Sequence, residues 1–283
     1  MSGIEEFKSY LLNQDKSINT IKSYVSHVED YSRWFQESFG ISFTKLYREN
    51  ILDFKSYLLN IKNLNAKSIN AKLAALMKLN EFILSKNIQE DIVVFKTDYI
   101  KVQTEYASPA IITRQDVESF RQTILENESK RDYAIVTLLA YSGMRISEAV
   151  NLKLSDVNLT AREIVVRYGK GKKQRLVIIN DKVVNAIKTY LSERTKLRNR
   201  DSEYLFVSRE SCRISRTRIN HIFNGYSDKI TPHMLRHFFC SYALEKGWSV
   251  HEVAGQAGHA NIHTTLIYTN PSMEEMKRKS NLL

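Results

Sequence analysis

The stretch TPHMLRHFFCSYAL, residues 231–244, decides how the second half of this chain folds. A threonine followed by a proline is a helix N-cap with proline at the first helical position, so a helix begins here. Apolar residues continue the helix, and Gly247 ends it. Because His233 and Arg236 are three residues apart, they share one face of that helix. An imidazole beside a planar guanidinium is suited to chemistry on a phosphate ester.

Further candidate groups lie on both sides of this helix. Arg145 follows the turn Ser142-Gly143 and begins a helix, in which Glu148 could orient its guanidinium. Lys170 lies between two glycines at the tip of a predicted β-hairpin. His259 and Tyr268 follow downstream, and a tyrosine hydroxyl is a possible covalent nucleophile.

The first 97 residues predict a compact helical domain. A short amphipathic helix at 4–13 is followed by a long helix that Ser17 caps and Gly40 ends. Two more helices are expected through 51–58 and from about Ser68 to Phe82. Residues 98–112 read as an extended linker, and Thr113 with Asp116 resembles a capping box that opens the second domain, 113–283.

The second domain predicts helices with two strands between them. The helices are expected at 113–127, 130–141, 146–153, 181–197, about 214–225, from Pro232 to Gly247, and from Ser249 to near Gly258. Arg162–Tyr168 and Gln174–Ile179 read as a hairpin, Tyr204–Val207 as a short strand, and the tail Met273–Leu283 as a helix. The fold class is therefore mostly α with a small antiparallel β-sheet.

Composition narrows the function classes. The formal net charge is +11, nearly all of it in residues 107–283, which favours a polyanionic partner such as nucleic acid. The two cysteines have no partner at metal-ligand spacing and fit a reducing compartment. No membrane span or signal peptide is visible. We therefore expect a cytoplasmic, nucleoid-associated protein with no membrane partner.

The ordered set of candidate groups resembles the active site of the tyrosine recombinases. The resemblance rests on the blocks GMRISEAVNLKLSDV, GKGKKQRLVII, TPHMLRHFFCSYAL and GHANIHTTLIYTN, within residues 110–275. The residues that match the family's six active-site positions, in order, are Arg145, Lys170, His233, Arg236, His259 and Tyr268. One departure is Gly255-Gln256-Ala257, where members usually carry bulkier aliphatic residues, so the helix before His259 is expected to be looser.

The resemblance implies a fold and a mechanism. The fold is a helical, SAM-like core-binding domain plus a mixed α/β catalytic domain, which form a C-shaped clamp on DNA. Tyr268 would attack a scissile phosphate and form a 3′-phosphotyrosyl bond, while Arg145 and Arg236 clamp the phosphate oxygens. Lys170 would protonate the leaving 5′-hydroxyl, His233 would act as acid and base near Tyr268, and His259 would hydrogen-bond the phosphate. The resemblance implies no cofactor, metal or ATP.

The resemblance also implies partners. Duplex DNA at a recombination site would contact the hairpin tip and the helix after Ser211, through Lys172, Lys173, Arg175, Arg213, Arg216 and Arg218. A solvated basic face is the alternative for the latter region. The tail, residues 272–283, would dock in a neighbouring subunit and link a homotetramer on synapsed DNA. The alternative is a tail packed on its own domain.

Several functions fit this set of residues. The first is site-specific recombination through a Holliday junction. A type IB topoisomerase and a catalytically idle DNA-binding relative are the other classes. Because the helical domain starts almost at Met1, we expect no arm-binding module. The chain therefore resembles the minimal group of Xer proteins and TnpI-type resolvases of transposon cointegrates or DNA dimers, with a small phage or element integrase as the alternative.

Overall fold

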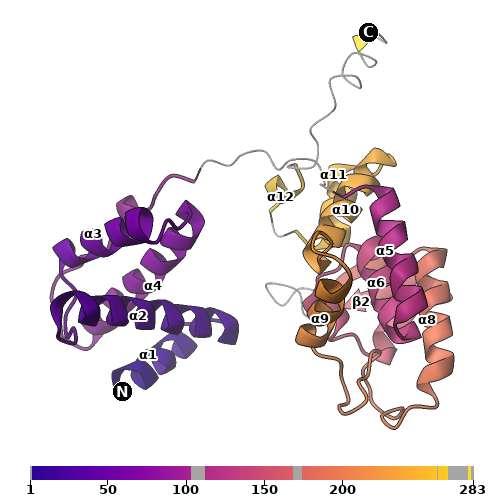
Figure 1. Ribbon diagram of the computed structural model, residues 1–283, viewed down its shortest axis with the longest axis horizontal. Helices are drawn as coiled ribbons and strands as arrows, with labels where there is room; N and C mark the ends of the chain where they lie inside the picture. Colours follow the sequence, from indigo (N-terminus) through magenta and orange to yellow (C-terminus); the bar gives the residue numbers. More distant parts are fainter. Residues whose placement is uncertain (1, 103–111, 168–173, 260, 267–279, 282–283) are drawn as a thin grey trace. The chain divides into compact units, whose positions relative to one another are not determined.

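The computed structural model describes residues 2–102, 112–167, 174–259, 261–266 and 280–281. The chain divides into two units, Met1–Thr104 and Glu105–Leu283, and each is described by itself (Figure 1). Most of the predicted linker lies outside the described residues, as does nearly all of the tail. The domain limits at 97 and 113 and the C-shaped clamp remain predictions.

The first unit is helical, as predicted. Two local signals set the limits of its longest helix: the Ser17 side chain accepts from the Thr20 backbone N–H, and Gly40 ends the helix at φ +73°. The fourth helix begins earlier than predicted because Asn65 caps it. The elements are α1 (Ser2–Asn13), α2 (Ile18–Phe39), α3 (Arg48–Ser56), the π-helix η1 (Tyr57–Ile61), α4 (Ala66–Ser85) and the 3₁₀ turn η2 (Lys96–Asp98).

An aromatic cluster forms the centre of this unit. The Tyr31 ring is fully buried and makes edge-on contacts with Phe54, at 5.1 Å between centroids, and with Phe43, at 5.2 Å. Trp34 packs against the rings of Tyr31 and Phe54. Among the described residues, the Tyr31 hydroxyl has no hydrogen-bond partner. The ring therefore stabilises the core, whereas its hydroxyl has lost water without a replacement.

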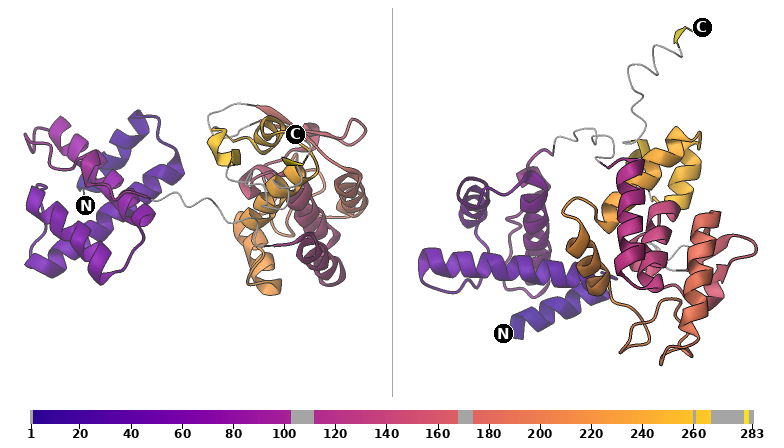
Figure 2. Two further views of the ribbon diagram at one scale, coloured as in Figure 1. Left: turned by 90° about the horizontal axis from the view of Figure 1, so that it is seen from above. Right: turned by 45° about the vertical axis from the view of Figure 1, so that its right-hand side comes forward.

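The second unit is built around α6 (Lys130–Ser142), which packs against α5 (Arg114–Asn127), α8 (Asp181–Arg194) and α10 (Pro232–Glu245) (Figures 1 and 2). Every residue of α6 from Ala134 to Ser142 is buried, as expected for a helix enclosed on all sides. The remaining helices are α7 (Ile146–Ala149), the 3₁₀ turn η3 (Leu154–Asp156), α9 (Arg216–Tyr226), α11 (Val250–Ala257) and α12 (His263–Leu266).

A small antiparallel sheet lies in this unit, as predicted. Its order is β1 (Val157–Asn158), β2 (Glu163–Val166) and β3 (Arg175–Ile178), with Glu163 opposite Ile178 and Val166 opposite Arg175. Within the described part of the chain, β3 pairs with a strand on one side only. The tip of the predicted hairpin, residues 168–173, lies outside the described residues.

Two predictions for this unit were wrong, and one interaction explains both. The helix expected over 146–153 ends at Ala149, and the strand expected at Tyr204–Val207 is only an isolated bridge to Lys153. The Leu154 N–H donates to the Glu203 carbonyl, and the Leu205 N–H donates to the Leu152 carbonyl, both at 2.8 Å. Residues 152–154 therefore use their backbone groups for this distant pairing instead of a longer helix.

No helix within the described ranges combines the length and the apolar character that crossing a membrane would require.

We expect Tyr31→Phe to raise the free energy of unfolding of the first unit by about 1 kcal/mol, because it keeps the ring and removes a buried hydroxyl that has no partner among the described residues. Urea unfolding followed by Trp34 fluorescence in a Trp248→Phe background isolates this unit, since the chain has two tryptophans. Tyr10→Phe is the matched control, with little change expected. A loss of stability in Tyr31→Phe would show that the hydroxyl has a partner.

Candidate active site

The end of helix α11 binds three arginines through three consecutive carbonyl oxygens. The last carbonyls of a helix lack partners within it and carry partial negative charge, so they are natural acceptors for guanidinium groups. Gly258 ends α11 in the left-handed conformation, at φ +69°. The donor–acceptor pairs are Arg175 Nε with Gln256 (3.0 Å), Arg236 Nη1 with Ala257 (2.6 Å) and Arg145 Nη2 with Gly258 (3.0 Å).

Arg145 is positioned by a turn and a short helix. Gly143 precedes it at φ +67°, and a β-carbon there would lie 2.5 Å from the Phe239 ring, so glycine is required. The Arg145 backbone N–H donates to Glu148 Oε2 at 2.8 Å, and its guanidinium donates to Glu148 Oε1 at 3.1 Å. Glu148 thus makes the orienting contacts expected from its spacing.

Glu148 also binds Arg175, which the sequence placed among the DNA contacts. The two Arg175 terminal nitrogens donate to the two Glu148 oxygens at 2.9 and 2.8 Å, and the Arg175 side chain is only 13% exposed. Burial alone raises the pKa of Glu148, but Arg175 and then Arg145 lower it overall, so the carboxylate stays charged. Arg175 therefore lies inside the protein, on the same face of its strand as the buried Val177 and Ile179.

Arg236 is the buried member of the set. It is 5% exposed, and its Nη1 donates to the carbonyls of Gly143 and Ala257. Its Nη2 is buried and has no hydrogen-bond partner among the described residues. Burial, followed by the charge of Arg145, lowers the Arg236 pKa to about 10, which leaves it charged at neutral pH. Because a buried cation whose donor has no partner is costly, this donor is available to bind an anion.

Three histidines surround these cations. His233 Nε2 lies 2.7 Å from His237 Nε2, and His259 Nδ1 lies 2.7 Å from the Thr265 hydroxyl. Burial and then neighbouring charges lower all three pKa values, those of His237 and His259 to about 4. The imidazoles are therefore neutral at pH 7, and each can donate or accept one proton.

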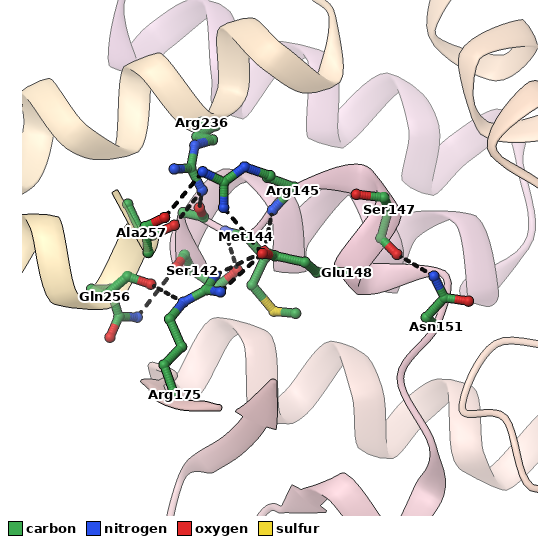
Figure 3. Close-up of polar contacts among 12 residues, drawn as sticks. Ser142, Met144, Arg145, Ser147, Glu148, Asn151, Arg175, Arg236, Gln256 and Ala257 are labelled. Atoms are coloured by element: carbon green, nitrogen blue, oxygen red, sulfur yellow. Dashed lines mark hydrogen bonds and ion pairs between the residues drawn. The ribbon is translucent and has the colours of Figure 1, made fainter. Parts of the chain in front are cut away.

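Figure 3 shows side chains from α7, β3 and α10 converging on the end of α11. Arg145, Arg175 and Arg236 come together there with Gln256 and Ala257.

The side chain of Gln256 fixes α11 to its neighbours, contrary to the expectation that this helix is looser. Its Oε1 accepts from the Ile178 N–H at 3.0 Å, and its Nε2 donates to the carbonyls of Ile178 at 2.7 Å and Ser142 at 3.2 Å. Gln256 is 6% exposed. The unusual residue therefore ties the helix to β3 and to the end of α6.

Sequence reasoning missed the roles of Gln256, Arg175 and Thr265. Arg175 could have been found from the two-residue alternation that places it with Val177 and Ile179 on the buried face of β3. Thr265 is fully buried beside His259, and no local pattern marks it.

The other predicted residues lie apart from the arginine cluster or outside the described residues. Arg213, Arg216 and Arg218 are exposed around the start of α9. Arg213 hydrogen-bonds Asn151 and lies over the Tyr204 ring, and Arg218 is 3.7 Å from Glu128. The predicted residues outside the described ranges are Lys170, Lys172, Lys173 and Tyr268.

Another arginine, Arg194, has a structural role. Arg194 is buried and donates to the carbonyls of Arg200, Ser202, Tyr204 and Leu205, so it supports a loop.

Within the ranges that the structure describes, no three His, Cys, Asp or Glu side chains are placed to hold a metal ion.

Comparison with known proteins gives matches to both units. The profile of the phage integrase family matches residues 110–275, and that of the phage integrase N-terminal SAM-like domain matches residues 4–87. The chain is 53% identical over 284 residues to the TnP I resolvase of Bacillus thuringiensis, covering 100% of both proteins. It is 31% identical over 282 residues to the tyrosine recombinase XerA of Thermococcus kodakarensis, covering 97% of this chain and 93% of that protein.

Solved structures show the same fold. The crystal structure of XerA recombinase matches with a TM-score of 0.53 and 26% identity, over 99% of this chain and 97% of that one. The post-cleavage complex of XerH with palindromic difH substrate matches with a TM-score of 0.73 and 21% identity, over 95% of this chain and 81% of that one.

We expect Gly258→Ala to lower the free energy of unfolding by about 2 kcal/mol or more, because alanine is strained at this positive φ. In addition, its β-carbon would lie 2.8 Å from the Arg175 guanidinium. Thermal or urea unfolding of the full chain measures the change. Gly255→Ala is the matched control, since a β-carbon there meets nothing within 4 Å and alanine should stabilise the helix by about 1 kcal/mol. Equal stability in the two variants would contradict the packing described here.

Proposed function

The chain belongs to the phage integrase family of tyrosine recombinases, enzymes that break and rejoin DNA, and from that premise we propose which of its residues carry out site-specific recombination. The observation that carries the proposal is the arginine cluster at the end of α11. Arg236 offers a buried donor that has no partner among the described residues. Arg236 donates to the carbonyl of Ala257, and Arg145 donates to the next carbonyl, that of Gly258. Together they form a site for a phosphate of the DNA backbone.

The proposed chemistry is a transfer of one phosphodiester bond. The Tyr268 oxygen forms a bond to the scissile phosphorus as the bond to the 5′-oxygen breaks, which leaves a 3′-phosphotyrosyl link. Arg145 and Arg236 donate to the non-bridging oxygens and neutralise the charge that develops in the transition state. The free 5′-hydroxyl of another strand then reverses the step, so the bond energy is conserved and no ATP is consumed.

We assign the two proton transfers to Lys170 and His233. Lys170 protonates the departing 5′-oxygen, and His233 takes the proton that Tyr268 loses. His233 suits this role because burial and then Arg236 lower its pKa, so its imidazole is neutral and can accept a proton at pH 7. His259, held by Thr265, is likewise neutral and hydrogen-bonds the phosphate.

We propose that the partner is duplex DNA at a specific site, bound in the cytoplasm at the nucleoid. The net charge of +11 lies mostly in the second unit, and Arg213 and Arg216 are exposed at the start of α9. Lys172 and Lys173 add charge next to Lys170 along the chain. Contacts of this kind to phosphates supply affinity and salt dependence rather than sequence preference.

Within the family we favour a resolvase of transposon cointegrates. The support is the 53% identity to TnP I resolvase over the whole of both chains. A small integrase of a phage or mobile element is the alternative, and a type IB topoisomerase fits less well because the full-length relatives are named as recombinases or resolvases. Recombination of a plasmid with two directly repeated sites into two circles would support the resolvase.

We expect Tyr268→Phe to bind the recombination site with unchanged affinity but to form no covalent complex, because the nucleophilic oxygen is absent while the charged surface is intact. Incubation with a nicked suicide substrate, followed by denaturing gel electrophoresis, detects the adduct. The native chain should give both the adduct and a Holliday junction intermediate. A phosphotyrosyl adduct in the variant would refute the assignment of the nucleophile, and cleavage without any junction would favour the topoisomerase.

We also propose that the tail links four protomers on synapsed DNA by docking in a neighbouring subunit. Its apolar residues Met276, Leu282 and Leu283 suit burial against a partner. Deleting residues 273–283 should therefore leave binding to a single site intact and reduce synapsis and coordinated cleavage. Gel-shift and cross-linking of paired sites measure both properties. Normal tetramer assembly by the shortened chain would mean that the tail packs on its own subunit.

A further inference from the structure

The carboxamide of Gln256 occupies the free edge of strand β3. Within the described residues β3 pairs only with β2, so its other edge presents backbone groups without a strand partner. Gln256 bonds both the N–H and the carbonyl of Ile178, as a peptide group of a neighbouring strand would. The same amide also donates to the carbonyl of Ser142, the last residue of α6.

The backbone carbonyl of Gln256 binds the side chain of the residue at the other end of the same strand. Its carbonyl accepts from Arg175 Nε at 3.0 Å, and Arg175 is the first residue of β3 as Ile178 is the last. One residue of α11 therefore contacts the first and the last residue of β3 and the last residue of α6. Ser142 lies only three residues before Arg145, so this junction links the segments that carry two of the clustered arginines.

We propose that Gln256 is a positioning residue for the phosphate clamp. Its side chain fixes the last turn of α11 against β3 and α6, and so places the carbonyls of Ala257 and Gly258 where they hold Arg236 and Arg145. The inference rests on the proposed role of these two arginines in neutralising the scissile phosphate. Gln256 itself touches neither the phosphate nor the reacting atoms.

A methionine at this position separates packing from hydrogen bonding. Gln256→Met keeps an unbranched side chain of similar length, which fills the same space. It leaves the N–H of Ile178 and the carbonyls of Ile178 and Ser142 without their partners, so the last turn of α11 is free to shift. A displacement of about 1 Å in a clamp of this kind can cost about 100-fold in rate.

The experiment compares two substrates that differ in the charge of the scissile phosphate. One is the native phosphodiester, and the other carries a methylphosphonate, in which a methyl group replaces one non-bridging oxygen and removes the negative charge. In both, a Tyr268–phosphorus bond forms and the bond to the 5′-oxygen breaks. Because the neutral substrate needs less cationic stabilisation, an arginine defect should slow the phosphodiester selectively. Single-turnover cleavage at saturating DNA gives the two rates.

We expect Gln256→Met to slow cleavage of the phosphodiester about 10- to 100-fold and cleavage of the methylphosphonate less than about threefold, with DNA affinity unchanged. Arg145→Ala is the reference and should show the same selective loss. Gln89→Leu is the matched control, because Gln89 is also a buried glutamine, bonded to Leu46 and Asp91 in the first unit. It should leave the ratio of the two rates unchanged.

The outcomes separate the inference from the proposal it rests on. If Arg145→Ala slows both substrates equally, the charge-neutralising role of the arginines is wrong, and the positioning role falls with it. If Arg145→Ala is selective but folded Gln256→Met slows both substrates equally, or neither, only the role of Gln256 is overturned.

Gln256→Glu keeps the inference testable if the methionine variant does not fold. The introduced carboxyl accepts from the Ile178 N–H and, once protonated, also donates to one carbonyl. Its selective defect should therefore shrink as the pH is lowered, with the native chain measured at each pH as the reference. A defect that stays constant across the pH range would overturn the hydrogen-bond basis of the proposal.

Discussion

The structure of the second unit depends on the interaction between the end of one helix and three guanidinium groups. Three cations so close together repel one another, and the lowered pKa of Arg236 reports both its burial and the charge of Arg145. The carbonyls at the end of α11 and the carboxylate of Glu148 provide the compensating negative charge. One carboxylate against three guanidiniums leaves the cluster cationic, so an anion completes it.

This arrangement leaves the cluster positively charged at neutral pH, as the proposed phosphate site requires. The three histidines contribute none of it, because burial and the neighbouring charges keep their imidazoles neutral. They remain able to accept or donate single protons. In the proposed mechanism, arginines therefore supply the charge and histidines transfer protons. Arg175 lies inside the protein and donates to both oxygens of Glu148. The same carboxylate binds Arg145, so Arg175 helps to hold Arg145 in place.

Elements whose ends are set by local contacts could be predicted from the sequence. Ser17 binds an N–H three residues away, Thr113 and Asp116 bind each other, and Ser249 begins α11, all as expected. The errors fell where backbone groups pair across long separations. The shortened helix after Arg145 and the bridge at Tyr204 both arise because residues 152–154 pair with residues 203–205. Nothing in either segment encodes that pairing locally.

The sequence by itself determined the order of the candidate residues, which is Arg145, Lys170, His233, Arg236, His259 and Tyr268. It also marked the starts of two nearby helices, through the caps Thr231 and Ser249. Only the tertiary structure decided that Arg175 faces inward. It also decided which groups hold Arg145 and Arg236 at the end of α11. Arg145 and Gly258 are 113 residues apart along the chain, and Gln256 and Ser142 are 114 apart. Such contacts depend on where whole helices and strands pack. Gln256 is unusual in the sequence, and only the folded structure shows that it connects α11 to the edge of β3, to the end of α6 and to Arg175.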